Sequence, residues 1–549
     1  MSYPAIRPAD VPIDSAGNVD IPAFVAMVSG NPALAEPSDI ATLVNAWSEF
    51  LNRPVTPPPT PSAGWSDLSA PAGAVAIAVP SGGNLQQAFQ GVRNNSSDQL
   101  RLADGGVWNG QDLSGIVKTG KVGAPIVIGG SGNGPIPKIV PTSNPGFGRG
   151  SRTGSQGNLT FCHTELAASA QANGHGAEYQ GGPDYPDPAC SKNVRFEGVH
   201  AHNFAQGFAL QGIDSLTLFR CSLYDNDDMG AGLPPGVDAF VALSNRVKLE
   251  DCVVDRGGAL APGPYSQGFY FQFDNGPAND AISCLFSRAG SHGIHGRSPC
   301  NVTGCVLWNN SQNQLGYYDG WNGSNGQPPG VSGRWADNVF LEGKNIDAAN
   351  VRGTGVLITN TSQSNPPVFE GNIFANRAEG VGPAINFDPY SGTSVRGCIV
   401  RGNIVYNWPT CLYVGAPSGG GTCGGVVASG NTFVDTQGGT LVELFNQSAA
   451  TFSGNRYFST RSDCFVVAGV RHDFQWWKAN VEPTATWGNP AFPDPTRSML
   501  KFAQSKGFAT ADALMVRVRT MSKPTWDDTL RPKAMLNYFR AGFSLPALP

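Results

Sequence analysis

The chain has 549 residues, of which 70 are glycine and only 14 % are charged, and this composition excludes a coiled coil or a helical bundle. Its 40 % hydrophobic and 10 % aromatic content is too high for a disordered chain, so a turn-rich all-β protein fits best. A net charge of −5 without a Lys/Arg cluster argues against nucleic acid and favours a neutral sugar polymer as partner. Residues 1–12 lack signal-peptide features, and no apolar run is long enough for a membrane span.

The start of the chain has a different pattern from the rest. Residues 1–53 include apolar positions at helical spacing from Ser38, a predicted N-cap, to Leu51. Residues 54–73 are rich in proline, which favours an extended, semi-rigid spacer. We therefore expect a small N-terminal helical module and a linker before the main body begins at Ala74.

From residue 74 onward, short apolar strands alternate with turn residues. One early helical pattern, with Leu85, Ala88, Phe89 and Val92 on one face, suits a helix that closes the end of a stack of strands. Similar strand openings then recur about every 20–35 residues, and no interval holds a crossover helix, so successive units are predicted to stack as coils. The third residues of these openings are Gly198, Cys221, Cys252, Cys284, Cys305, Asn338, Asn372, Asn403, Asn431 and Asn455.

Two of these openings are especially informative, residues 302–310 (VTGCVLWNN) and 369–374 (FEGNIF). They resemble the rungs of the right-handed parallel β-helix found in pectate-lyase-like enzymes and phage tailspikes. The resemblance covers residues 74–459 and implies an all-β solenoid whose inward side chains form one continuous core. Residues 460–549 are then expected to be a C-terminal cap and tail.

The eleven cysteines are an odd number in a long chain, which argues against a disulfide framework and predicts mostly buried free thiols. Cys411 and Cys423 bracket a Gly/Ser-rich loop, and a disulfide between them stays open as an alternative. Four cysteines share one register and are predicted to stack in an inward ladder: Cys221, Cys252, Cys284 and Cys305.

The same register predicts which neighbouring side chains face inward and which face outward. The residues eleven positions before the four cysteines are predicted to face inward: Leu210, Val241, Phe273 and Ile294. By strand alternation, the residues that follow them face outward: Gln211, Ala242, Asp274 and His295. Asp274 and His295 are therefore expected to be neighbours on adjacent coils, and the pattern extends this outward column to Asp319.

This outward column is a candidate catalytic site. Asp274 and Asp319 lie two coils apart, about 9.6 Å along the stack, and carboxyl groups about 6.5–9.5 Å apart suit an inverting glycosidase. His295 between two carboxylates would be held protonated and able to donate a proton. We predict Asp274, His295 and Asp319 as catalytic residues. The predicted substrate-binding residues are Arg297, Tyr270, Tyr317, Trp321 and Trp335.

Other interpretations of these residues stay open. The outward column is equally compatible with ordinary surface or with a structural hydrogen-bond ladder. Asp225, Asp227 and Asp228 form either a catalytic or Ca²⁺-binding cluster or a solvated turn. No lysine stands between Lys248 and Lys344, which weakens a lyase mechanism with a lysine base without excluding elimination. We expect no metal and no cofactor.

The main hypothesis follows from the resemblance to tailspikes. It is a bacteriophage virion protein that binds a host cell-surface polysaccharide and depolymerises it if the outward column is catalytic. Residues 1–53 would attach it to other virion proteins, analogy suggests a homotrimer, and the missing signal peptide agrees with an extracellular virion protein released by lysis. The alternatives are a non-catalytic structural or decoration fibre of a virion, and a bacterial polysaccharide lyase or glycoside hydrolase.

Overall fold

The computed structural model describes the chain from residue 64 to residue 549, with short gaps. The gaps are residues 116–117, 143–144, 149–156, 181–183, 228–235, 261, 264–265, 317–329, 350, 363, 381, 391 and 417–420. The predicted N-terminal module therefore lies outside the described residues. So do four residues of the predicted sites: Asp228, Tyr317, Asp319 and Trp321.

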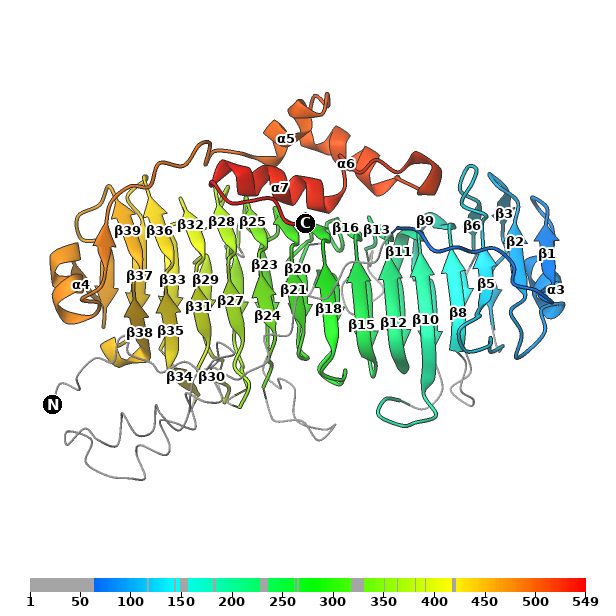
Figure 1. Ribbon diagram of the computed structural model, residues 1–549, viewed down its shortest axis with the longest axis horizontal. Helices are drawn as coiled ribbons and strands as arrows, with labels where there is room; N and C mark the ends of the chain where they lie inside the picture. The colour runs from blue at the N-terminus through cyan, green and yellow to red at the C-terminus, as the bar shows by residue number, and fades with distance from the viewer. Residues whose placement is uncertain are drawn as a thin grey trace, which may run out of the picture. The chain divides into compact units, whose positions relative to one another are not determined.

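The described chain coils repeatedly through three parallel sheets, and nearly every coil adds one strand to each sheet (Figure 1). Sheet 1 pairs strands in parallel from the first coil to the last. Its strands are β1 (Ala76–Val79), β2 (Gln99–Leu102), β5 (Ile126–Gly129), β8 (Gly157–Cys162), β10 (Ser191–Glu197), β12 (Ile213–Phe219), β15 (Asn245–Glu250), β18 (Asn279–Ile282), β21 (Asn301–Thr303), β24 (Arg334–Ala336), β27 (Val368–Glu370), β31 (Ile399–Arg401), β35 (Val426–Ser429) and β38 (Ala450–Ser453).

Sheet 2 follows sheet 1 in each coil, and two long strands, β9 and β11, continue from it into sheet 3. Its strands are β3 (Val107–Asn109), β6 (Lys138–Val140), the first parts of β9 (Glu165–Gln180) and β11 (His200–Gln211), β13 (Ser222–Tyr224), β16 (Val253–Asp255), β19 (Leu285–Ser287), β22 (Val306–Trp308), β25 (Val339–Leu341), β28 (Ile373–Ala375), β32 (Ile404–Tyr406), β36 (Thr432–Asp435), β39 (Arg456–Ser459) and β42 (Thr486–Trp487).

Sheet 3 completes each coil, and a small extra sheet lies between it and sheet 1. Besides the ends of β9 and β11, sheet 3 contains β4 (Leu113–Ser114), β7 (Phe147–Gly148), β14 (Val237–Ala242), β17 (Gln267–Phe271), β20 (His292–Gly296), β23 (Gln312–Leu315), β26 (Val356–Ile358), β29 (Ile385–Phe387), β33 (Thr410–Val414), β37 (Thr440–Leu444), β40 (Phe465–Val467) and the antiparallel β41 (Val470–His472). The extra sheet pairs β30 (Ser394–Arg396) with β34 (Thr422–Gly424). The architecture is a parallel β-helix, as the sequence predicted.

The core fills the inside of the coils, and its ladders confirm most of the predicted register. Cys221, Cys252, Cys284 and Cys305 are buried and stacked, and the Cys284 amide donates to Cys305 Sγ at 3.4 Å. The ladder then continues through the buried asparagines. The Cys305 amide donates to Asn338 Oδ1 at 2.9 Å, and Asn455 Nδ2 donates to Glu482 Oε1 at 3.1 Å. In the first of these coils the pairing places Val199, rather than Gly198, in the register of Cys221.

All eleven cysteines are free thiols, and all except the half-buried Cys423 are buried. The prediction of buried free thiols is confirmed. Cys411 points into the core and forms no disulfide with Cys423.

Short helices close both ends of the stack. Helix α3 (Leu85–Gln90) is capped by the Asn84 side chain and buries Leu85 and Phe89, so the predicted closing helix is confirmed. At the other end, α4 (Phe474–Asn480) places Trp477 in the core, where its ring stacks on Phe465 at 4.5 Å. Each helix covers apolar side chains that have no further coil beside them.

The C-terminal arm, residues 495–549, lies along the side of the stack and not over its end. One 3₁₀ turn, η2 (Gln447–Ala449), lies in the last coils and outside the arm. The helices of the arm are α5 (Met499–Ser505), α6 (Ala511–Arg519) and α7 (Pro532–Gly542), with a 3₁₀ turn at η3 (Lys523–Thr525). Figure 1 shows these helices, in orange and red, along the flank formed by sheet 2. The expected cap is therefore limited to the α4 region, because outward apolar side chains of sheet 2 hold the arm on the flank.

The folded body also begins earlier than the predicted linker boundary. Ser66 hydrogen-bonds Glu197 through its amide, at 2.8 Å, and its hydroxyl, at 2.6 Å. The Arg220 guanidinium lies over the rings of Trp65, at 4.8 Å, and Trp526, at 4.5 Å. The last part of the predicted spacer is thus docked on the β-helix, against the C-terminal arm. None of the helices in the described part of the chain is long and apolar enough to cross a membrane.

Candidate functional site

The outer face of sheet 3 is the candidate site, because long connections border it on both sides. Residues 256–266 and 342–355 lead into sheet 3, whereas residues 359–367 and 388–393 lead out of it. Loops carried on a rigid scaffold are the usual position of binding residues. Sheet 2, in contrast, is covered by the C-terminal arm.

Strand pairing places one outward residue of each coil in a continuous row on this face. We call this row, with one residue from each coil, the outer row. Its members from β14 to β37 are Phe240, Tyr270, His295, Gln314, Leu357, Asn386, Tyr413 and Glu443. Within the row, aromatic and amide side chains predominate, and its only carboxylate is Glu443.

The centre of the outer row is a stack of rings. The Tyr270 and His295 rings are 5.0 Å apart and nearly parallel, at 22°. His292, on the same strand as His295, stacks on it at 4.9 Å and 13°. Gln314 Oε1 lies 2.8 Å from His292 Nε2, and Gln314 Nε2 donates to the Gly316 carbonyl at 2.8 Å. These contacts hold the imidazoles in fixed orientations.

Arg297 lies at the edge of this stack, on the same side of the strand as His295. Its Nη1 donates to the Tyr270 hydroxyl at 2.7 Å, and that hydroxyl donates to Gln272 Oε1 at 2.5 Å. The guanidinium also lies 5.0 Å from the centre of the Phe273 ring. The structure thus brings together Tyr270 and Arg297, two of the predicted binding residues.

The two imidazoles of the stack are neutral at physiological pH. His292 is only 4 % exposed and His295 only 3 %. Burial lowers the pKa of His292 to about 4, and burial together with His292 and Arg297 holds the pKa of His295 well below its usual value. On the preceding coil, His295 therefore faces the ring of Tyr270 and not the expected carboxylate of Asp274, whereas Asp319, the other expected neighbour, lies outside the described residues.

Asp274 does not lie beside His295. It follows β17 in a turn, where its carboxylate accepts the Leu243 amide at 3.0 Å, and burial raises its pKa. The pairing sets Tyr270 opposite His295 and Phe269 opposite Ile294, so Leu210, Val241 and Ile294 face inward as predicted while Phe273 does not. Counting back from the cysteines failed because the connection after β17 is longer than the one after β20.

Trp335 is also misplaced by the sequence prediction. It is 0 % exposed and stands in the core register of sheet 1, between Val302 and Phe369. A side chain in that position cannot stack on a ligand. The catalytic role of Asp319 and the binding roles of Tyr317 and Trp321 stay predictions outside the described residues.

The acidic turn after β13 is structural in its described part. Asp225 forms ion pairs with Arg256 at 2.6 Å and Arg519 at 2.9 Å, which joins the C-terminal arm to the β-helix. Asp227 accepts the amide of Leu260 at 2.5 Å. Among the described residues, no group of three or more His, Cys, Asp or Glu side chains is arranged to hold a metal ion.

A second polar group on the same face was missed by sequence reasoning. Tyr413 stands between Asn386 and Glu443 in the outer row, and Asp388 lies two residues beyond Asn386. Burial raises the pKa of Asp388, while burial, Asp388 and Glu443 together raise the pKa of Tyr413. The alternation of β29 and β33 could have revealed this group, but no cysteine anchor marks those coils.

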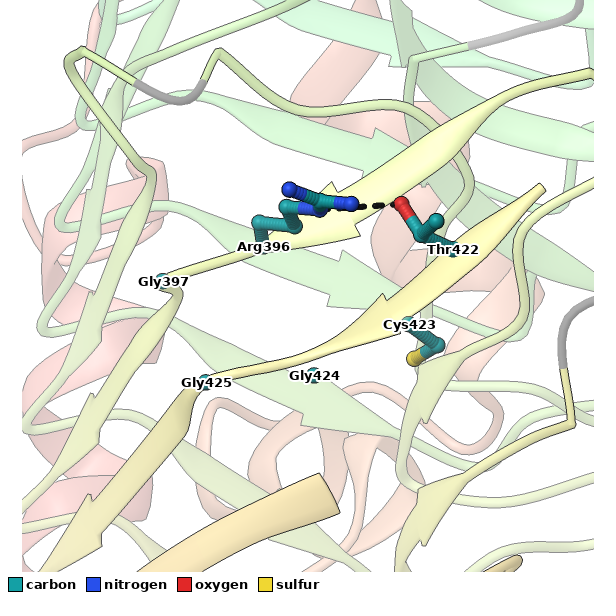
Figure 2. Close-up of a pocket in the computed structure, with 6 residues that line it drawn as sticks. All are labelled: Arg396, Gly397, Thr422, Cys423, Gly424 and Gly425. Carbon is teal, nitrogen blue, oxygen red and sulfur yellow. Dashed lines mark hydrogen bonds between the residues drawn. The ribbon is translucent and has the colours of Figure 1, made fainter. Parts of the chain in front are cut away.

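A hollow of about 480 Å³ opens beside this group, on the extra sheet (Figure 2). Arg396 and Thr422 form its polar side, and Arg396 Nε donates to Thr422 Oγ1 at 3.0 Å. Cys423 also lines the hollow, and burial raises the pKa of its thiol to about 12. The rest of the lining is backbone: Gly397, Gly424 and Gly425.

No protein-family model and no curated protein matches the sequence. Among solved structures, a mutant of the PL6 family alginate lyase AlyGC is 11 % identical over 83 % of this chain, with a TM-score of 0.48. The Dettilon tailspike protein is 11 % identical over 71 % of this chain and 68 % of its own, with a TM-score of 0.41. Pectate lyase Pel9A is 12 % identical over 55 % and 76 %, with a TM-score of 0.34. The chain spans 58 % of the alginate lyase, and the fold assignment rests on the strand pairing above.

Proposed function

We propose that the protein binds an extended polysaccharide along the outer face of sheet 3. The observation that carries the proposal is the outer row itself, whose half-buried members are Phe240, Tyr270, Asn386, Tyr413 and Glu443, on either side of the buried His295 and Gln314. Consecutive coils repeat about every 4.8 Å, so the face presents a regular series of side chains to a chain molecule. Long connections on both sides of the sheet support the same proposal.

The chemistry of this row suits a hydroxyl-rich ligand. Flat rings pack against the C–H faces of sugars, and half-buried amide and hydroxyl groups, here those of Asn386 and Tyr413, exchange hydrogen bonds with sugar hydroxyls. The buried His295 ring stacks on Tyr270 and fixes its orientation. Arg297, held by Tyr270, adds a single oriented cation. Half-buried Tyr270 keeps part of its surface available to a ligand.

Binding of a capsular or lipopolysaccharide panel to the full chain tests this function. Tyr270→Ala should weaken binding at least tenfold, because it removes the central ring and the partner of Arg297. Trp487→Ala is the control, since Trp487 is a 39 % exposed aromatic on β42 and outside the outer row. Equal binding by both variants would contradict the proposed site.

We further propose that the protein is a tailspike-like component of a virion, attached to other virion proteins through residues 1–53 and assembled as a homotrimer. The order of a helical pattern, a proline-rich segment and a β-helix supports this assignment. A density map of the intact particle would test it. Removal of residues 1–53 should abolish incorporation, and normal incorporation of the shortened chain would contradict the role of that segment.

Hydrolysis of the bound glycan is a second candidate function, and Asp388, Tyr413 and Glu443 favour it. A carboxyl group with a raised pKa is suited to act as a general acid, and a carboxylate two coils away leaves room for water. Asp388→Asn and Glu443→Gln should each stop the shortening of the polymer without weakening its binding. Saturated reducing ends would indicate hydrolysis, whereas an unsaturated product with new ultraviolet absorbance would indicate elimination. Asp319→Asn tests the remaining sequence prediction in the same assay.

A further inference from the structure

The hollow on the extra sheet exists because position 424, opposite Arg396, is a glycine and contributes no side chain. Arg396 and Gly424 are direct partners across β30 and β34. A Cβ built on Gly424 would meet only the Ala449 carbonyl oxygen, at 3.9 Å, so the space beside Arg396 is open. A larger residue at position 424 would fill this space without a backbone clash.

Arg396 is fixed in orientation at the side of this hollow. Its Nε donates to Thr422 Oγ1, and that hydroxyl donates to Ser394 Oγ at 2.8 Å. Figure 2 shows the guanidinium extending alongside Thr422, while the Cys423 side chain points away from it. The bond to Thr422 uses Nε, and neither terminal nitrogen of Arg396 forms a hydrogen bond or an ion pair with the described residues.

The charge of Arg396 is not neutralised by a carboxylate of the described residues. Two nearby arginines on sheet 1, Arg334 and Arg401, differ in this respect, because both form ion pairs with Glu370. Such a pair would occupy the guanidinium and leave nothing for a ligand. An oriented guanidinium presents paired N–H donors that match carboxylate and sulfate oxygens.

We propose that this hollow is a subsite for an anionic group, a carboxylate or a sulfate ester, carried by a sugar unit of the bound polysaccharide. The inference rests on the proposed function, and it replaces the neutral polymer that the net charge of −5 favoured with an acidic one. The hollow also follows the outer face of sheet 3 in the coil, since residues 388–393 alone join β29 of that sheet to β30, which carries Arg396. A chain bound along sheet 3 can therefore extend to the hollow.

Ligand-observed NMR on the full chain tests the subsite with small probes. The probes are methyl glucuronoside, glucose 6-sulfate, uncharged methyl glucoside and inorganic sulfate. At least one anionic sugar should bind, the uncharged sugar should not, and inorganic sulfate should bind at least tenfold more weakly than the anionic sugar. Equal binding of the uncharged sugar, or equal binding of inorganic sulfate, would overturn the proposal.

Variants locate the binding. Arg396→Gln and Gly424→Leu should each weaken binding of the anionic sugar at least tenfold, the first because it removes the cation and the second because it fills the hollow. Arg246→Gln is the control, since Arg246 is an exposed arginine on sheet 1 that pairs with Asp214. Unchanged binding in Arg396→Gln would refute the subsite. If these variants no longer bind the small anionic sugar while Tyr270→Ala still binds the polymer with wild-type affinity, the subsite is supported and the proposed outer-row site is refuted.

Discussion

Sheets 2 and 3 share one strand repeat, yet their outer faces have different chemistry. The outward side chains of sheet 2 are mostly apolar and pack against the C-terminal arm. They are Val253, Leu285, Val306, Trp308, Val339, Leu341, Ile373, Ala375, Ile404, Tyr406 and Val434. The outer row of sheet 3 carries rings, amides and Glu443. The spacing between strands is therefore the same on both faces, and the types of outward side chain decide what each face can contact.

The comparison also shows how the arm is held. Apolar contacts supply the bulk of its interface, and ion pairs fix its position: Arg519 contacts Asp225 at 2.9 Å, and Arg540 contacts Asp337 at 3.1 Å. The arm is made by the chain itself, so the face of sheet 2 is satisfied internally. Sheet 3 has polar groups that a hydroxyl-rich ligand can satisfy.

The largest expected effect comes from breaking the sheet 2 interface. Leu536→Asp on α7 places an unpaired charge in a fully buried site, and the free energy of unfolding should fall by about 4 kcal/mol or more. Leu500→Asp on α5, where the side chain is 44 % exposed, should change it by less than about 0.5 kcal/mol. Denaturant unfolding measures both, and equal stabilities would mean that the arm does not cover sheet 2.

The next effect concerns the neutral histidine stack of sheet 3. The pKa of His292 falls from about 6.5 in the unfolded chain to about 4 in the folded protein, so folding is favoured by the neutral ring. This contribution to the free energy of unfolding is fully present above pH 6.5. It decreases by about 3 kcal/mol as the pH falls from 6.5 toward 4. His292 faces Gln312, Gln314 and His295, and the charge of Arg352 also opposes protonation.

Melting temperatures from pH 7 to pH 4 test this linkage. His292→Gln should show a shallower loss of stability on acidification than the wild type. Identical slopes for the two proteins would show that the buried imidazole does not set the acid response.

A smaller effect is expected where the start of the described chain docks on the corner beside sheet 2. Trp65→Ala removes stacking with Arg220 and Trp526 and should cost about 1–2 kcal/mol. A fragment that begins at Ala72 should therefore still fold, with a slightly lower melting temperature. Failure of that fragment to fold would show that the contact is essential to the body.

The smallest expected change in stability is at the centre of the outer row. Tyr270→Phe deletes only the hydroxyl that accepts from Arg297 and should alter stability by less than about 1 kcal/mol. Polysaccharide affinity should fall about three- to tenfold, because Arg297 loses its orientation. Tyr406→Phe, on the covered face of sheet 2, should leave affinity unchanged. An equal loss of affinity in both would remove the distinction between the two faces.

The candidate site was predictable only in part. Tyr270 and Arg297 were identified correctly as outward residues, because strand alternation holds within β17 and β20. Asp274 was assigned wrongly, since alternation was carried across connections of unequal length. Trp335 was assigned to binding as an aromatic residue, without use of the register that places it opposite Val302 in the core. Asp388 and Arg396 lie on coils without a cysteine anchor, and their grouping depends on coils that are distant in sequence.

The sequence by itself determined the coil: the recurrent Cys and Asn positions identified the ladder, and glycine-rich turns without crossover helices required parallel stacking. Those features are local and repeat in each coil, so a single chain reveals them. Only the tertiary structure decided that residues 495–549 cover sheet 2, that His295 stacks on Tyr270, and that a hollow opens beside Arg396. The physical reason is that these contacts join segments whose relative register depends on connection lengths and side-chain packing, which no periodic pattern encodes.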